Sequence, residues 1–153
     1  MSSLELKIPP PVVALLLATL MWLTTFVAPS LALPFGFRLG VALVLVCIGQ
    51  GISISGMVAF RRAKTTVNPI KASAASSLVT LGVYRFTRNP MYLGLLLTLL
   101  AWAVYLSSPP AVLWILAYVL YISRFQILPE ERVLLSLFGA EYATYQGQVR
   151  RWL

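Results

Sequence analysis

The sequence predicts an all-α integral membrane protein, a single domain with about four transmembrane helices and short cytoplasmic helices after them. Hydrophobic residues make up 59% of the 153 residues and charged residues only 10%, whereas soluble domains carry about 25% charged residues. The apolar residues gather in runs long enough to cross a bilayer, and proline or arginine bounds each run. We expect transmembrane helices at about 12–33, 39–60, 90–106 and 111–128, and C-terminal cytoplasmic helices over 130–153 with a break at Gly139.

The composition excludes several kinds of catalytic site. The chain contains no histidine and no aspartate, which rules out a histidine general base, a histidine metal ligand and a Ser-His-Asp triad. Its single cysteine, Cys47, can form neither an intramolecular disulfide nor a cysteine cluster, and we expect no metal. The net charge is +8. Because the charges flank apolar segments, we expect membrane lipids and not nucleic acid as partners. The oligomeric state stays open.

The first two apolar runs each have two interpretations. A secretory signal peptide would fit the small residues at Ser30–Ala32, but signal cores are about 7–15 residues long. The run Val12–Ala28 exceeds that length, which favours a retained transmembrane helix. In the second run, Gly49, Ser53 and Gly56 recur on one helical face. Small residues allow a neighbouring helix to approach closely, and we prefer that interpretation to a cofactor contact.

The connection between the second and third runs is basic and determines the expected topology. Residues 61–88 hold six lysines and arginines, whereas the turn Ser107–Pro110 holds no charge. We also expect a short interfacial helix at Ala72–Leu78. By the positive-inside rule the connection is cytoplasmic, and four crossings then place both termini in the cytoplasm. We expect a protein of the bacterial inner membrane in which the third helix starts beside the end of the fourth.

The start of the third helix combines several signals. Asn89 is a strong helix N-cap and Pro90 is favoured at the first helical position, so a helix is predicted to begin there. Its first turn presents free backbone N–H groups and the positive end of the helix dipole. Together with Arg85 and Arg88 this turn can bind an anion. The alternative is a well-capped membrane helix with arginines at the interface.

The expected topology brings cations, carboxylates and an aromatic side chain together. Arg124 and Glu131 are spaced i, i+7 and share a helical face, so we expect them to pair. Glu130 is turned by about 100° from Glu131 and would face a ligand. The members of this predicted cluster are Arg88, Asn89, Tyr92, Arg124, Glu130 and Glu131. They suit a ligand with both a carboxylate and a positive centre, or they form a structural Arg–Glu network, and the residues alone leave both interpretations open.

Several of these segments, in this order, resemble the isoprenylcysteine carboxyl methyltransferase family. The matching stretches are Gly82–Tyr84, Arg88–Gly94, Glu130–Glu131 and Phe138–Tyr145. The resemblance covers about residues 65–153, and the phospholipid N-methyltransferases are similar in the C-terminal part. It implies several transmembrane helices and S-adenosylmethionine as cofactor, with the C-terminal helices closing over it. Where the family often has histidine this chain has Asn89, which can position a group but cannot transfer a proton.

The resemblance also implies roles for single residues. The expected cofactor-binding residues are Gly82, Val83, Tyr84, Arg88, Asn89, Pro90, Tyr92, Gly94, Glu130 and Glu131. Of these, Arg88, Glu130 and Glu131 are the candidate catalytic residues. Arg124 and Arg150 are added as candidate substrate-binding residues.

The predicted function is a membrane-embedded methyltransferase that uses S-adenosylmethionine to O-methylate a carboxylate on a lipophilic or lipidated acceptor. Methyl transfer depends mainly on the alignment of nucleophile, methyl group and sulfur, and a carboxylate nucleophile needs no base. The alternatives are a phospholipid amine N-methyltransferase, a relative that binds the cofactor without turnover, and a non-catalytic membrane subunit with a structural Arg–Glu network.

Overall fold

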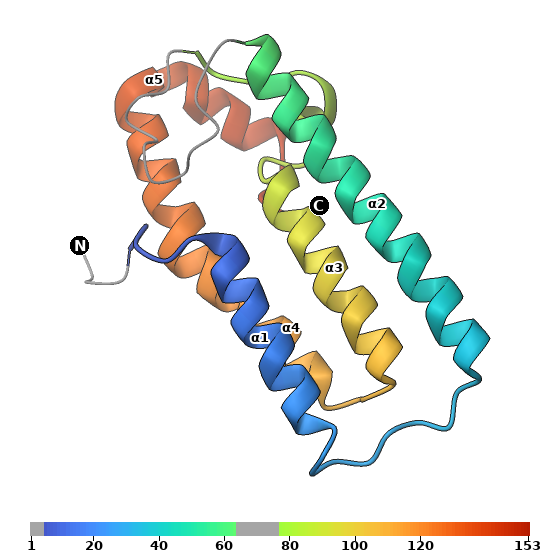
Figure 1. The fold of residues 1–153 in the computed structure, drawn as a ribbon. Coiled ribbons are helices and arrows are strands. Elements are labelled where there is room, and N and C mark those ends of the chain that lie inside the picture. The colour runs from blue at the N-terminus through green and yellow to red at the C-terminus, as the bar shows by residue number, and fades with distance from the viewer. Residues whose placement is uncertain (1–4, 64–76) are drawn as a thin grey trace.

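The described part of the chain folds into a bundle of helices without a strand (Figure 1). This computed structural model describes residues 5–63 and 77–153. The elements are α1 (Pro10–Thr24), α2 (Phe35–Arg62), the 3-10 helix η2 (Gly82–Arg85), α3 (Pro90–Leu106), α4 (Ala111–Ile122), the π-helical turn η3 (Ser123–Ile127) and α5 (Leu128–Gln148). The interfacial helix expected at Ala72–Leu78 lies outside the described residues, except for its last two positions, which are not helical.

The first helix is shorter than the predicted range 12–33. It ends at Thr24, and the chain from there to Pro34 forms turns and extended backbone. Pro29 and Pro34 explain the early end. Proline has no N–H group for the helix, and it disfavours helical backbone at the residue before it. The result is a helix of 15 residues.

Helices α2 and α3 touch each other at glycines. With 28 residues, α2 extends beyond the predicted range 39–60 at both ends, whereas α3 has the predicted bounds. A side-chain carbon built on Gly94 of α3 would overlap Ser53 of α2 and would lie 2.5 Å from the carbonyl oxygen of Gly49. The small-residue face of α2 therefore serves close helix packing, the interpretation that its spacing favours.

The fourth helix does not end at residue 128 as predicted. Helical backbone continues from Ala111 through η3 into α5 as far as Gly139. Pro129 lies in the first turn of α5, where its main effect is a missing N–H group. In an α-helix that N–H would bond the carbonyl of Phe125. Here the Phe125 carbonyl accepts a hydrogen bond from the backbone N–H of Leu6 at 3.0 Å. The break predicted at Gly139 is confirmed, with φ at 49°.

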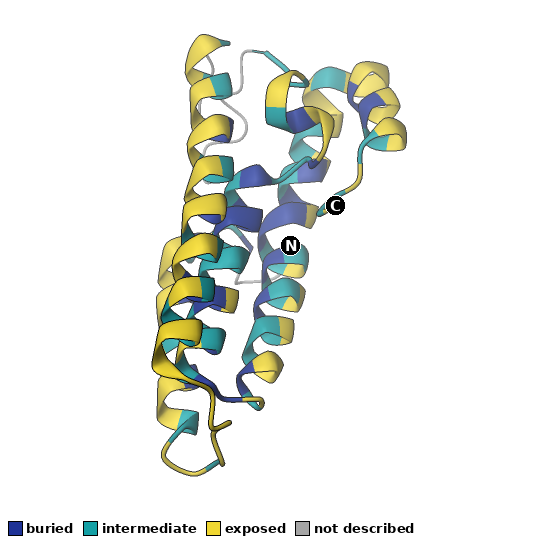
Figure 2. Ribbon diagram, turned by 90° about the vertical axis from the view of Figure 1, so that its right-hand side faces the viewer, coloured by how far each residue is buried: buried dark blue, intermediate teal, exposed yellow. Residues whose placement is uncertain are grey.

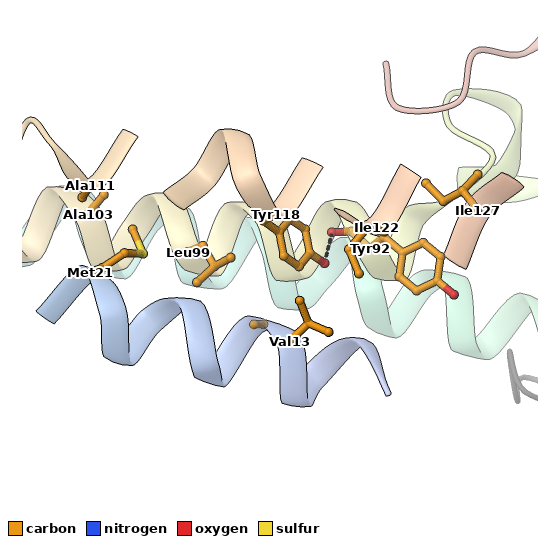
Figure 3. Packing of buried hydrophobic residues seen from close by; sticks show 10 residues of the cluster. Val13, Met21, Tyr92, Leu99, Ala103, Ala111, Tyr118, Ile122 and Ile127 are labelled. Atoms are coloured by element: carbon orange, nitrogen blue, oxygen red, sulfur yellow. Dashed lines mark hydrogen bonds between the residues drawn. The ribbon is translucent and has the colours of Figure 1, made fainter. Parts of the chain in front are cut away.

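The core joins α1, α3 and α4 (Figure 3). Tyr118 and Ile122 of α4 are fully buried in one cluster with Met21 of α1 and Leu99 of α3. The hydroxyl of Tyr118 donates a hydrogen bond to the backbone carbonyl of Tyr92 at 3.2 Å, drawn dashed in Figure 3. This bond ties α4 to the first turns of α3, where the candidate site begins.

The outward faces of the helices are exposed (Figure 2), and many of the exposed residues are large and apolar. Leu15 of α1, Val44 of α2 and Leu113 of α4 are each more than half exposed. Among the described residues, Phe35–Arg62 and Ala111–Gln148 are long and apolar enough to cross a membrane, and α1 and α3 are apolar but shorter. These features support an all-helical membrane protein, and the arrangement with four crossings stays a prediction.

Candidate functional site

The start of α3 has the predicted backbone, but the side chain of Asn89 acts differently. The helix begins at Pro90 with Asn89 at the N-cap position, yet the Asn89 side chain makes no capping hydrogen bond. Its Nδ2 donates instead to the backbone carbonyl of Arg151 at 2.9 Å. The backbone N–H of Arg88 donates to the carbonyl of Arg150 at 3.1 Å. The Asn89 side chain therefore binds the C-terminal segment and does not cap α3, so the predicted side-chain cap is wrong.

Glu131 binds two arginines from distant parts of the chain. Its Oε1 lies 3.1 Å from Nη2 of Arg88. Arg151 donates from Nε to Oε1 at 3.1 Å and from Nη2 to Oε2 at 2.7 Å. This hydrogen bonding raises the pKa of Arg151 above its usual value, although partial burial acts in the other direction. Because both carboxylate oxygens are engaged, Glu131 fixes the start of α3 and the C-terminal segment relative to α5.

The predicted pairing of Arg124 with Glu131 is wrong. Nη1 of Arg124 lies 3.0 Å from Oε1 of Glu5, and Nη2 of Arg132 lies 2.7 Å from Oε2 of the same carboxylate. The cause is η3. A π-helical turn holds more residues than an α-helical turn, so it rotates the residues before it relative to those after it. Spacing i, i+7 across η3 therefore no longer places two residues on one face.

Glu130 points toward Tyr92 of α3, whereas Glu131 binds Arg88 and Arg151. The hydroxyl of Tyr92 donates a hydrogen bond to Oε1 of Glu130. Adjacent helical residues diverge by about 100°, which explains why the two carboxylates have different partners. A carboxylate has two oxygens, so the bond to Tyr92 leaves Glu130 able to accept from a further donor.

Arg88 retains unused hydrogen-bonding capacity. Its side chain is 11% exposed, and within residues 5–63 and 77–153 its Nε and Nη1 atoms have no hydrogen-bond partner. Buried donors in folded proteins are nearly always paired. Since Glu131 contacts only Nη2 of this guanidinium, Nε and Nη1 are placed to bind an anionic group such as a carboxylate.

Tyr84 is almost fully buried in η2, which opens at Gly82 with φ at 65°. Its ring packs edge to face on Phe60 of α2, with centroids 5.4 Å apart. Its backbone carbonyl accepts a hydrogen bond from the hydroxyl of Tyr145 at 2.7 Å. Burial raises the pKa of Tyr84 well above its usual value, with smaller contributions from Tyr145 and Glu130. The phenol therefore stays protonated.

The other predicted site residues lie around this cluster or outside it. Gly94 is in contact with α2, and Val83 is partly buried beside Tyr84. Arg150 contributes its backbone carbonyl while its side chain is exposed, and Arg124 is bound by Glu5. The residues that the structure brings together are Tyr84, Arg88, Asn89, Pro90, Tyr92, Glu130 and Glu131.

The sequence did not indicate the roles of Arg151, Trp152 and Glu5. Arg151 and Glu131 are 20 residues apart, with the break at Gly139 between them, so no helical spacing connects them. The indole Nε1 of Trp152 donates to Oγ of Ser123 at 3.2 Å, which further holds the C-terminal segment. At the C-terminal end the sequence shows only two basic residues before a tryptophan, and this pattern does not predict which residue they bind.

The chain is similar to known methyltransferases over most of its length. A family model described as phospholipid methyltransferase matches residues 37–141. A probable protein-S-isoprenylcysteine O-methyltransferase of Oryza sativa subsp. indica is 36% identical over 116 residues, covering 74% of this chain and 59% of the rice protein. Protein-S-isoprenylcysteine O-methyltransferase A of Arabidopsis thaliana is 31% identical over 110 residues, covering 70% of this chain and 54% of that protein.

A third relative has no assigned activity. An uncharacterized protein of Haemophilus influenzae is 51% identical over 63 residues, which are 41% of this chain and the whole of that protein. The chain thus spans between 54% and 59% of the length of the two plant relatives.

Proposed function

The chain belongs to the phospholipid methyltransferase family, whose model matches residues 37–141, and from this premise we propose that it is a membrane methyltransferase that uses S-adenosylmethionine. The observation that carries the proposal is the buried guanidinium of Arg88. Two of its donors find no partner in the described part of the chain, and the carboxylates of Glu130 and Glu131 lie close by. Such a site suits a ligand that carries both charges.

The residues present fit S-adenosylmethionine, which carries a carboxylate, an ammonium group and a sulfonium. Arg88 would hold the carboxylate through Nε and Nη1, and the first turn of α3 adds the positive end of its dipole. Glu130 would bind the ammonium or the ribose hydroxyls through the oxygen that Tyr92 leaves available. Glu131, already bound by two arginines, would position Arg88. The rings of Tyr84 and Tyr92 would border the adenine and the sulfonium.

The acceptor that we propose is a lipidated carboxylate. When bound, the cofactor would supply an electrophilic methyl group for the acceptor oxygen. The protein's task is to align the two reactants. The two plant relatives are named as O-methyltransferases of isoprenylcysteine. A carboxylate is ionised at neutral pH, so its methylation needs no base, in keeping with a chain that has no histidine.

A phospholipid amine is the second candidate acceptor. The description of the family model supports it. An ammonium group must lose a proton before it can attack the methyl group. In this reaction Glu130 would accept that proton, a role supported by its hydrogen bond with the Tyr92 hydroxyl.

Binding of radiolabelled S-adenosylmethionine to detergent-purified protein tests the cofactor. The wild-type protein should bind it. Arg88→Gln should weaken binding by about tenfold or more, because a charge-assisted contact is lost. Arg85→Gln is the matched control, since Arg85 is exposed in the same segment. A well-folded protein that does not bind would support a non-catalytic membrane subunit with a purely structural Arg–Glu network.

Transfer of the labelled methyl group then distinguishes the acceptors. A prenylated cysteine with a free carboxylate should yield a methyl ester, which mild base hydrolyses. Phosphatidylethanolamine would instead yield a methylamine that is stable to base. Bound cofactor without transfer to either acceptor would contradict both candidate reactions.

A further inference from the structure

The bundle has a second candidate binding site, away from the cluster that Glu131 forms with Arg88 and Arg151. We propose that a groove between α1, α2 and α3 binds an anionic phospholipid, with one acyl chain in the groove and the phosphate on the guanidinium of Arg38. Arg38 lies near the start of α2, and its contact residue Tyr105 lies near the end of α3. Glu131 lies at the opposite end of the bundle, beside the start of α3.

The groove has the size and lining of a lipid site. Its volume is about 450 Å³, within the range of small-molecule pockets. The lining is almost wholly apolar and includes Ala14 and Ala18 of α1, Ala42 and Val46 of α2, and Leu99 and Trp102 of α3. Figure 1 shows α3 between α1 and α2, and α3 contacts both of these helices. The small side chains of α1 and α2 leave this space open.

Two polar side chains of the lining, Trp102 and Thr98, are already engaged within the protein. Trp102 Nε1 donates to the carbonyl of Ala18 at 3.0 Å and joins α3 to α1. Thr98 donates to the carbonyl of Gly94 at 2.9 Å and accepts from Gln50 at 3.1 Å. The groove therefore presents hydrocarbon to its occupant, which is what an acyl chain requires.

Arg38 is not part of the lining, but it binds a residue that is. It is four residues before Ala42 and eight before Val46, so all three share a face of α2. Its Nη1 donates to the backbone carbonyl of Tyr105, which also lines the groove, at 3.1 Å. Its Nε is buried and has no hydrogen-bond partner among the described residues. The nearest aromatic contact is the Phe35 ring, with its centroid 6.0 Å away.

The chain has no carboxylate side chain to offer Arg38. Its four acidic residues are Glu5, Glu130, Glu131 and Glu141. Glu5 binds Arg124 and Arg132. Glu130 binds Tyr92, and Glu131 binds Arg88 and Arg151. Glu141 lies in α5, which Figure 1 shows at the other end of the bundle from the start of α2. The described acidic side chains thus leave Arg38 without a counter-charge, and at a membrane surface lipid phosphate is the abundant anion that can supply it.

This lipid differs from the methyl acceptor of the proposed function. The acceptor must bring its reacting group to the start of α3. A head group at Arg38 lies near the other end of α3, and a helix of 17 residues is about 25 Å long. The site would therefore hold a lipid of the opposite leaflet, and it does not depend on the methyltransferase proposal.

Native mass spectrometry of the delipidated protein in mild detergent tests the charge preference. Phosphatidylglycerol and phosphatidylcholine with the same acyl chains are added separately. We expect one phosphatidylglycerol to be retained about tenfold more strongly than phosphatidylcholine, and Arg38→Gln to remove this preference. Arg62→Gln, at the other end of α2, is the matched control and should retain it. Equal retention of the two lipids by the wild type, or an unchanged preference in Arg38→Gln, overturns the proposal.

A second variant tests the groove itself. Ala42→Phe fills the groove and should lower retention of phosphatidylglycerol, whereas Gly51→Phe adds a ring at a position with open space around it and should not. Thermal unfolding in detergent establishes whether each variant is folded. If Ala42→Phe does not fold, Arg38→Gln remains the decisive test. Displacement of the bound lipid by a prenylated cysteine, with Arg38→Gln having no effect, would assign the groove to the acceptor and overturn the proposal.

Discussion

At the scale of single residues, Glu131 holds the candidate site together because it binds Arg88 and Arg151 at the same time. Removing the carboxylate would leave two arginine charges beside each other with no counter-charge. Glu130 is different, because its described partner is the neutral hydroxyl of Tyr92. The two adjacent glutamates therefore have separable roles in stability and in ligand binding.

Glu→Gln variants at the two positions should give different results. Glu131→Gln should lower the free energy of unfolding by up to about 3–5 kcal/mol, the range for a broken buried ion pair. Glu130→Gln should leave thermal stability nearly unchanged and weaken binding of S-adenosylmethionine. Thermal unfolding and cofactor binding in the same detergent measure both effects. Normal cofactor binding by a folded Glu130→Gln protein would remove Glu130 from the cofactor site.

Arg151 should matter more than its neighbour Arg150. Arg151→Gln removes two charge-assisted hydrogen bonds to Glu131. Because the Arg151 side chain is 34% exposed, solvent screening reduces the loss to about 1 kcal/mol. Arg150→Gln changes an exposed side chain and should stay within about 0.5 kcal/mol. Chemical denaturation in detergent compares the two variants, and equal stability of both would contradict the assigned role of Arg151.

At the scale of helices, the contact between α2 and α3 depends on glycine. Gly94→Ala places a methyl group against Ser53 and the Gly49 carbonyl, so the two helices must separate, at a cost of about 1–3 kcal/mol. Gly51→Ala is the matched control. It has open space around it, and alanine in a helix should stabilise by about 0.5–1 kcal/mol. Thermal unfolding of both variants should show shifts of opposite sign.

Local signals predicted the helices well, whereas contacts between distant segments were beyond the sequence. Proline placed the start of α3, and a glycine placed the break in α5, because both act on their own backbone. Within the π-helical turn η3, the Phe125 carbonyl that Pro129 leaves free accepts a hydrogen bond from Leu6, more than a hundred residues away. Missing η3 caused the wrong pairing of Arg124, and missing the C-terminal segment caused the wrong role for the Asn89 side chain.

At the scale of the whole molecule, the cluster draws on η2, the start of α3, α5 and the C-terminal segment. The resemblance supplied the first three because their motifs are short and contiguous. The C-terminal segment contributes a single residue, Arg151, which follows the break at Gly139. No periodic sequence pattern connects Arg151 with Glu131. The presence of each helix and most members of the cluster are thus predictable from sequence, but most helix bounds and the partner of each charged group are not.

The predicted topology can be tested at the turn after α3. Positive charge gathers in residues 61–88 and is absent from Ser107–Pro110, so this turn should lie outside the cytoplasm. Ser108 is 4% exposed, which makes it a poor labelling position, whereas Pro109 is exposed. Pro109→Cys, in a Cys47→Ala background, should react with an impermeant maleimide in intact cells. Reaction only after permeabilisation would contradict the arrangement with four crossings.

The glycine contact between α2 and α3 also bears on how such chains are recognised. Gly94 closes the segment Arg88–Gly94 that resembles a cofactor-binding motif, yet its neighbours here are Gly49 and Ser53. A sequence search that demands this glycine therefore selects for the spacing of two helices as well as for ligand chemistry. A chain with a larger residue at this position could still bind the ligand if its second helix carried a compensating change. Pairs of positions across the two helices would then identify distant relatives better than the motif alone.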